Sequence, residues 1–217
     1  MTYLETPDGP MLEGSSAARL GELLVDYEAI LSELSGTLES TMMPGIEPVE
    51  VEVKLASRGL SCPDEIAVWF GWHNGVRLID GRRRGGIPLF HPHSLDEALH
   101  VYDLNRAELE RAYAEGVDYE LATYGAGEGW IQLDPLAESI AVECVRGGAQ
   151  SPRVRRPNID FADPFFAGKF RAVSLCTVVA SWIESARNSA FSWLETEQRW
   201  QVHREHLLTA RTGSILG

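Results

Sequence analysis

The chain has 217 residues, of which 44% are hydrophobic and 24% charged; these are the proportions of a soluble globular protein large enough to bury a sizeable core. Its formal net charge of −13 argues against nucleic acid as a direct ligand, because phosphate backbones require a basic surface. No apolar run reaches the ~18 residues of a membrane span, residues 1–14 do not resemble a signal peptide, and the three cysteines are dispersed, so we expect a cytoplasmic protein.

The negative charge is concentrated in two segments. Residues 1–60 hold eleven acids and three bases, a net −8, and residues 94–120 hold eight acids and two bases, a net −6. The remaining residues sum to +1, since −13 minus −14 is +1. Such a distribution keeps a protein soluble, or it steers a basic partner onto the acidic surface.

The first 38 residues predict a tail followed by a helix. Residues 1–14 contain prolines and glycines without periodicity, which is typical of a flexible tail. Ser15 or Ser16 would then cap an amphipathic helix. The apolar residues of its buried face recur at steps of three and four: Leu20, Leu24, Tyr27, Leu31, Leu34 and Leu38.

Two periods overlap in residues 46–58. A half-buried strand is indicated by apolar residues that alternate with charged ones. These residues are Val49, Val51, Val53 and Leu55. A helix opened by Pro48 would instead bury a different set on one face. This second set is Ile46, Val49, Val53 and Ala56.

Residues 61–75 have the sequence SCPDEIAVWFGWHNG, which predicts a short helix. Pro63 suits the first helical position, with Ser61 or Cys62 as the cap, and the two acids that follow it face the positive end of the helix dipole. The bulky residues recur at helical spacing, and Asn74-Gly75 favours the end of the helix. The residues of the buried face are Ile66, Trp69, Phe70 and His73.

Residues 76–80 and 86–90 predict two strands of a hairpin, joined by residues 81–85. The three consecutive arginines of this turn are more typical of a solvated hairpin tip than of a phosphate site. His91 and His93 follow. Two histidines are too few for a zinc site, so no metal is expected.

Ser94 and Glu97 form a capping box, which predicts a helix to about Glu115. Its buried face is Leu95, Ala98, Leu99 and Tyr102. Asn105 with Glu108 indicates a second start or a kink within it. The acids on this helix are too many for capping alone, and bases are scarce nearby, which predicts a partner-binding surface. The acids are Asp96, Glu97, Asp103, Glu108, Glu110 and Glu115.

The C-terminal half predicts three antiparallel strands, a basic loop and two helical segments. The strands are residues 119–123, 129–133 and 139–145. Arg153, Arg155 and Arg156 predict a basic loop, and Ser174 begins a core helix. From residue 188 to about 211 the apolar pattern continues at helical spacing, which predicts a C-terminal helical extension packed on the domain.

A proline followed by acids, then a bulky apolar helix ending in Asn-Gly, as in residues 63–75, resembles the signature of the SUKH superfamily. That family includes the yeast cell-wall-synthesis regulator and many bacterial immunity proteins. The amphipathic helix before this signature, the strands after it, the strand at residues 130–133 and the Ser174-capped helix follow the family's order over residues 17–187. The resemblance implies an α+β binding fold without catalytic residues, and it favours the helix for residues 46–58.

These observations predict an α+β fold, with a mainly antiparallel sheet of four to six strands packed by helices. We expect a tail over 1–14, a SUKH-like domain over 15–187 and the helical extension over 188–217. The sequence contains no catalytic motif of the nucleophile-elbow, Walker or His-Glu-x-x-His type, and no cofactor is expected.

Two hypotheses for the function follow. The first is a non-enzymatic module that binds a protein partner, such as the basic domain of a toxin neutralised by an immunity protein. The second is an enzyme or small-molecule-binding protein whose site is assembled from residues far apart in the sequence, such as Trp130, Arg153 and His91. A deep polar pocket with shifted titrations would favour the second hypothesis.

Overall fold

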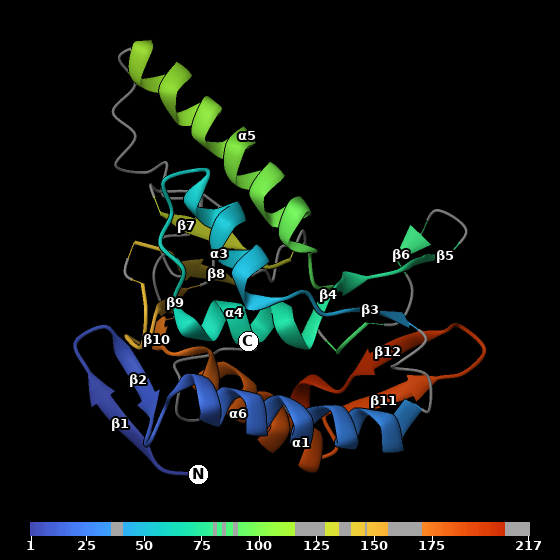
Figure 1. The fold of residues 1–217 in the computed structure, drawn as a ribbon. Coiled ribbons are helices and arrows are strands. Elements are labelled where there is room, and N and C mark those ends of the chain that lie inside the picture. The colour runs from blue at the N-terminus through green and yellow to red at the C-terminus, as the bar shows by residue number, and fades with distance from the viewer. Residues whose placement is uncertain are drawn as a thin grey trace.

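A computed structural model describes residues 1–35, 41–79, 82–83, 86–88, 91–115, 129–134, 140–145, 147–155 and 171–206. Over these residues the chain has an α+β fold (Figure 1). The α-helices are α1 (Ala17–Ser35), α3 (Pro48–Ala56), α4 (Asp64–Trp72), α5 (Leu95–Ala114) and α6 (Leu175–Arg187). In the described part of the chain, no helix has the length and apolar character needed to cross a membrane.

The largest sheet of the described residues has six strands in the order β1-β2-β10-β9-β8-β7. They are β1 (Tyr3–Thr6), β2 (Gly9–Leu12), β10 (Arg171–Val173), β9 (Arg153–Arg155), β8 (Ala141–Glu143) and β7 (Trp130–Gln132). Every neighbouring pair is antiparallel except β2 and β10, which are parallel. The predicted fold class, a mainly antiparallel sheet packed by helices, is therefore confirmed.

Three two-stranded sheets complete the strands of the described residues. They are β3 (Met42–Pro44) with β4 (His73–Val76), β5 (Leu78–Ile79) with β6 (Arg82–Arg83), and β11 (Phe191–Leu194) with β12 (Arg199–Val202). A 3₁₀ turn at Arg204–His206 follows β12.

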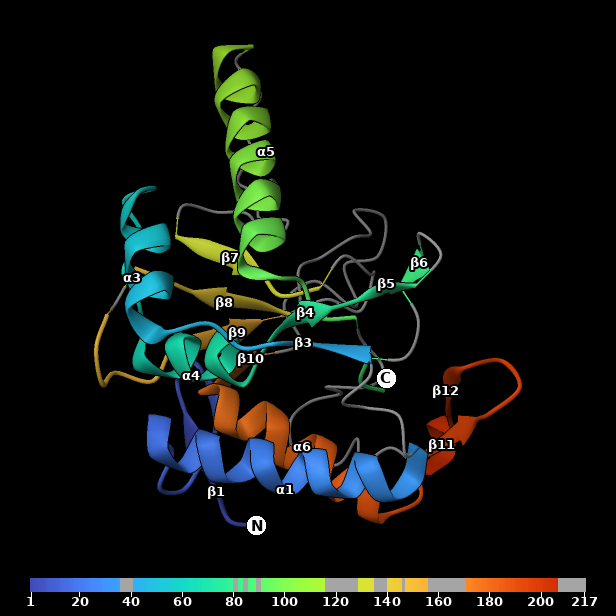
Figure 2. The ribbon, with the colours of Figure 1, turned by 45° about the vertical axis from the view of Figure 1, so that its right-hand side comes forward.

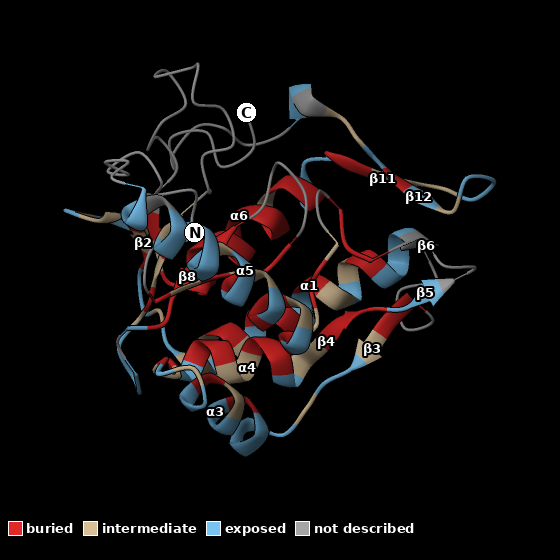
Figure 3. Ribbon diagram, turned by 90° about the horizontal axis from the view of Figure 1, so that it is seen from above, coloured by how far each residue is buried: buried red, intermediate tan, exposed pale blue. Residues whose placement is uncertain are grey.

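The core forms around α4, which lies above the side-by-side pair α1 and α6 in Figure 1. Trp69 and Phe70 of α4 are fully buried, as predicted. The Trp69 ring contacts Trp182 of α6 with 6.2 Å between ring centroids, and Trp182 in turn lies 5.7 Å from the Tyr27 ring of α1. Figure 3 colours the ribbon by burial and shows buried residues along most of α6 and on part of α4.

Helix α1 begins as predicted, because the Ser16 hydroxyl accepts a hydrogen bond from the Arg19 amide at 3.1 Å. Four residues of its predicted buried face are buried. They are Leu20, Leu24, Tyr27 and Leu31. Leu34 is exposed, and Leu38 lies outside the described residues.

Helix α3 resolves the ambiguity of residues 46–58 in favour of a helix, but the predicted buried face was wrong. Val51 and Leu55, four residues apart, point into the core, whereas Val49 and Val53 are each 64% exposed. The sequence pattern could not distinguish the two faces because valines lie on both, and contact with α4 selects one of them.

Helix α4 begins later and ends earlier than predicted. Pro63 is the N-cap itself and not the first helical residue, and His73 after Trp72 is already extended. Gly75 has φ of +93°, and a Cβ atom at this position would lie 2.6 Å from the Ser94 amide nitrogen. A glycine is therefore required where β4 passes beneath the start of α5.

The predictions for the two ends of the chain were wrong. Residues 3–12 form β1 and β2 of the main sheet, not a tail, and residues 191–202 form the β11–β12 hairpin, not a helix. In this hairpin Trp193 and Trp200 face each other with ring centroids 5.2 Å apart. The Trp200 indole donates to the Gly86 carbonyl at 2.9 Å, so the hairpin does pack on the domain.

Two further segments differ from the predictions. The partner of β5 is Arg82–Arg83 and not residues 86–90, so two of the three arginines lie in a strand. Arg153 and Arg155, predicted on a basic loop, form β9. The predicted strand at 119–123 lies outside the described residues, whereas those at 129–133 and 139–145 are confirmed as β7 and β8.

Candidate functional site

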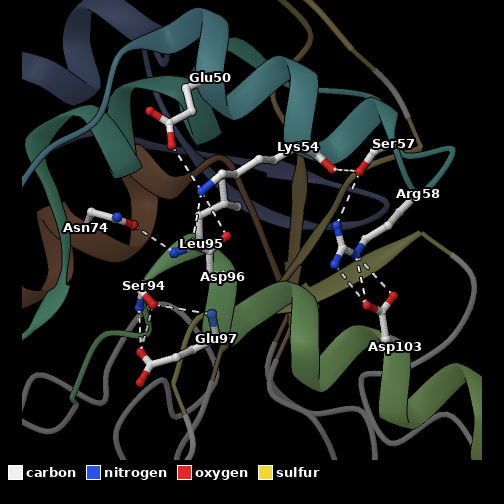
Figure 4. A network of polar contacts seen from close by, with 10 residues as sticks. All are labelled: Glu50, Lys54, Ser57, Arg58, Asn74, Ser94, Leu95, Asp96, Glu97 and Asp103. Atoms are coloured by element: carbon white, nitrogen blue, oxygen red, sulfur yellow. Dashed lines mark hydrogen bonds and ion pairs between the residues drawn. The ribbon is translucent and has the colours of Figure 1, made fainter.

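The predicted partner-binding helix, α5, begins with the capping box that the sequence predicted. The Ser94 hydroxyl accepts from the Glu97 amide at 3.3 Å, and the Glu97 carboxylate accepts from the Ser94 amide at 2.8 Å. The buried Asn74 side chain accepts from the Leu95 amide at 2.8 Å. These contacts satisfy N–H groups of the first turn and fix the helix on β4 (Figure 4).

The first half of α5 is anchored in the core, and the second half is not. Leu95, Ala98, Leu99 and Tyr102 are buried as predicted. From residue 103 to 115 none of the described side chains is buried, and Figures 1 and 2 show this half projecting away from the body of the protein. The structure has one continuous helix here and no second start.

Three of the six predicted partner-binding acids have contacts that hold α5 in place. Asp96 accepts from Lys54 of α3 at 2.9 Å, and Asp103 pairs with Arg58, whose Nη2 lies 3.0 Å from Oδ2. Glu97 belongs to the capping box. Figure 4 shows these hydrogen bonds and ion pairs, which connect α3 and the residues just after it with the first half of α5.

The other three acids lie on the projecting half. Glu108 pairs with Arg111 at 3.0 Å and Glu110 with Arg106 at 3.2 Å, both within the helix. The Glu115 carboxylate is exposed and makes no ion pair within the described residues. The expectation that cations are scarce near these acids was therefore wrong for four of the six, and their role in binding stays a prediction.

Two exposed apolar side chains on the projecting half were missed in the sequence. Leu104 is 54% exposed and Tyr113 is 65% exposed. Tyr113 lies eleven residues after Tyr102, which places both on one stripe of the helix. The available signal for Tyr113 was that this stripe, continued by Leu109, is longer than the part of the helix that the core can cover. Leu104, nine residues before Tyr113, lies on the opposite side of the helix.

The alternative site is brought together in part. Trp130 of β7 and Arg153 of β9 lie on the same face of the main sheet, with the Arg153 guanidinium carbon 5.7 Å from the Trp130 ring centroid. His91 is not with them. Its amide donates to Asp134 at 2.5 Å, beyond the other end of β7.

Arg153 is largely neutralised on this sheet. The buried Glu143 of β8 holds its guanidinium through two hydrogen bonds, one of them 2.8 Å from Nε to Oε2, and Asp8 lies 3.6 Å away. The arrangement is a cross-strand ion pair, because Glu143 lies beside Arg153 in the register of β8 and β9. It links these strands to the turn between β1 and β2.

Chemical groups suited to catalysis are sparse over the described residues. They contain no group of three histidine, cysteine or acidic side chains placed to hold a metal ion. The Ser192 hydroxyl lies 2.9 Å from Nε2 of His203 across the β11–β12 hairpin. Within the described residues no carboxylate contacts the His203 ring, so this pair lacks the third group that orients a catalytic histidine.

The three cysteines are free thiols, as expected from their spacing. Burial raises the pKa of Cys62 to about 11, and it raises the pKa of Cys144 further. Thiols with raised pKa values hold little thiolate at neutral pH, so neither is an activated nucleophile.

No model of a known protein family matches the chain, and no curated protein matches it either. The resemblance to the SUKH superfamily therefore rests on the motif of residues 63–75 and on the order of the sequence features around it.

Proposed function

We propose that this protein is a non-enzymatic binding module that acts by holding a protein partner against the projecting half of α5. The observation that carries the proposal is the exposure of Leu104 and Tyr113 on a helix half in which none of the described side chains is buried. Exposed large apolar groups among charges are characteristic of protein interfaces, and tyrosine is enriched at their centres.

The charge of this half supports a basic partner. Residues 103–115 carry four acids and two arginines, within a chain of net charge −13. Complementary charge accelerates association more than it raises affinity. The resemblance to the SUKH superfamily supports the more specific proposal, which is that the protein is an immunity protein that neutralises a bacterial toxin, or a related regulatory binder.

The test begins with partners captured from the native host by the purified protein. Association rates are then measured for the wild type and for Glu108→Lys at low and high salt. We expect the substitution to slow association at low salt. The effect should shrink as the Debye length falls from ~10 Å at 0.1 M to ~3 Å at 1 M.

A matched control is Glu22→Lys on α1. Glu22 forms an exposed i,i+3 pair with Arg19, just as Glu108 does with Arg111. The two variants therefore make the same change of charge in the same local setting, and only the position differs. Equal rates for the two variants would remove α5 from the proposed interface.

The apolar contact is tested separately. Tyr113→Ala should speed dissociation of the captured partner, and Val25→Ala on α1, which truncates a side chain of the same 65% exposure, should not. A buried interface tyrosine typically contributes about 1–3 kcal/mol, or roughly a fivefold to hundredfold change in dissociation rate. Turnover of a small molecule by the purified protein would overturn the non-enzymatic proposal itself.

A further inference from the structure

Arg155 on the main sheet has hydrogen-bonding groups that the described chain does not use. It occupies β9 two residues after Arg153, so both side chains lie on the face of the sheet opposite Val154, which is buried in the core. The Arg155 guanidinium carbon lies 3.9 Å from the centroid of the Trp130 ring, a stacked cation–π contact. This contact places the guanidinium over the Trp130 ring.

One edge of that guanidinium is unpaired. Nε and Nη2 of Arg155 are both buried, and neither has a hydrogen-bond partner in the described residues. These two nitrogens form the side of the guanidinium that binds both oxygens of one carboxylate or phosphate. Leaving them dry and unpaired is costly, because a buried donor without an acceptor loses its hydration and gains nothing in return.

Two other arginines in this protein show what such an edge binds. In Arg153 the same two nitrogens hold the two oxygens of Glu143. In Arg58 they hold Asp103, with Nε 3.0 Å from Oδ2. A carboxylate thus binds this edge in both Arg153 and Arg58. Of these three arginines, Arg155 alone has no carboxylate on this edge.

The charge around Arg155 decides between a carboxylate and a phosphate. Among the described residues, Arg153 and Arg155 contribute two positive charges, and Glu143 and Asp8 contribute two negative ones, so these four charges sum to zero. Burial and the neighbouring Arg153 lower the pKa of Arg155, but a guanidinium stays protonated in proteins. A monovalent anion gives the cluster a charge of −1, whereas dianionic phosphate gives it −2.

We propose that Arg155, stacked on Trp130, is a binding site for a monovalent carboxylate, which its Nε and Nη2 hold side-on. The site is separate from the projecting half of α5 and does not depend on the function proposed for that helix. Arg155 and Trp130 are partly exposed as whole residues, but Nε and Nη2 of Arg155 are covered, so a ligand reaches this edge from the solvent side only when the atoms that cover it move aside. The carboxylate belongs to a small molecule or to a peptide, and acetate reproduces the chemistry common to both.

The test is a titration of the full chain with acetate at constant ionic strength, followed through the arginine Nε–H signals by NMR. We expect the Arg155 signal to move and saturate, while the Arg153 signal stays in place because Glu143 already occupies it. Inorganic phosphate at the same ionic strength should bind more weakly. Tighter binding of phosphate would overturn the assignment to a carboxylate.

Arg155→Lys keeps the charge and removes the two-nitrogen edge. It should weaken acetate binding about tenfold or more, as expected for loss of a charge-assisted hydrogen bond. Arg58→Lys is the matched control, because it makes the same change at an edge that Asp103 already fills, and acetate binding should be unaffected. If Arg155→Lys does not fold, the wild-type titration still decides, since an Arg155 signal that fails to saturate refutes the proposal.

Discussion

Glu65 offers the sharpest test of how the core is held together. It lies in the first turn of α4, is only 3% exposed, and places its carboxylate at the start of α6. Its Oε1 accepts from the Ser174 hydroxyl at 2.8 Å and its Oε2 accepts from the Leu175 amide at 2.6 Å. Ser174 meanwhile caps α6 by accepting from the Cys176 amide.

Removing the Glu65 carboxylate should greatly lower the free energy of unfolding. Glu65→Ala leaves two buried donors without an acceptor, at about 1–3 kcal/mol each, so the free energy of unfolding should fall by about 2–6 kcal/mol. Asp64→Ala is the control one residue earlier, because Asp64 is exposed and loses only its interaction with the helix dipole, about 0.3–1 kcal/mol. Urea unfolding monitored by circular dichroism measures both values.

Glu65→Gln should lower the free energy of unfolding less than Glu65→Ala does. Comparison of Glu65→Gln with the wild type should show how the protonation of Glu65 contributes to stability at different pH values. Burial raises the pKa of Glu65 above 4.5, although the bonds from Ser174 and Leu175 oppose the rise. The folded state therefore keeps a proton that the unfolded state loses. This contribution is present at low pH and declines as the pH rises from 4.5 through the folded pKa, by at most about 1.4 kcal/mol per pH unit.

Because glutamine does not titrate, the difference in unfolding free energy between wild type and Glu65→Gln should shrink over that same pH range. Unfolding curves collected from pH 4.5 upward measure this difference directly. Parallel pH profiles for the two proteins would show that Glu65 has the same pKa folded and unfolded. A stable Glu65→Ala protein would further show that the carboxylate does not hold α6 on α4.

Three other substitutions test the packing. Trp69→Ala should lower the free energy of unfolding by about 3–5 kcal/mol, and an unchanged melting temperature would remove α4 from the core. Val51→Asp should unfold the protein, whereas Val53→Asp should change its stability by less than about 0.5 kcal/mol, and equal effects in urea unfolding would contradict the orientation of α3. Tyr27→Phe should stabilise the protein by about 1–3 kcal/mol, because the described residues offer its buried hydroxyl no hydrogen-bond partner; a lower melting temperature would mean that the hydroxyl is bonded.

Sequence reasoning succeeded where the signal was local. The capping box of Ser94 and Glu97 and the cap of Ser174 involve residues within a few positions of each other, and both were found. The buried stripe of α1 followed from helical spacing for the same reason. Such features depend on the segment alone, so they survive in any tertiary context.

The failures involve partners far apart in the chain. Residues 3–12 form the β1–β2 hairpin, which joins the main sheet through β10, and nothing near Gly9 in the sequence indicates this distant partner. The apolar residues of the hairpin at 191–202 also fit a helical spacing, so the sequence did not indicate that β11 and β12 pair with each other. Arg155 and Trp130 are 25 residues apart in the sequence, and only the register of three strands brings them together.

The parallel pairing of β2 with β10 also constrains how the protein is made. Val173 lies opposite Met11 in this pairing, and the Leu12 amide donates to the Thr177 hydroxyl at 2.8 Å. On the ribosome, β1 and β2 emerge first. They can pair with the rest of the main sheet only after more than 160 further residues have been synthesised. Contacts so distant in sequence slow folding. The edge of β2 that later pairs with β10 therefore stays unpaired, and open to chaperones or to other chains, for most of the synthesis of this protein.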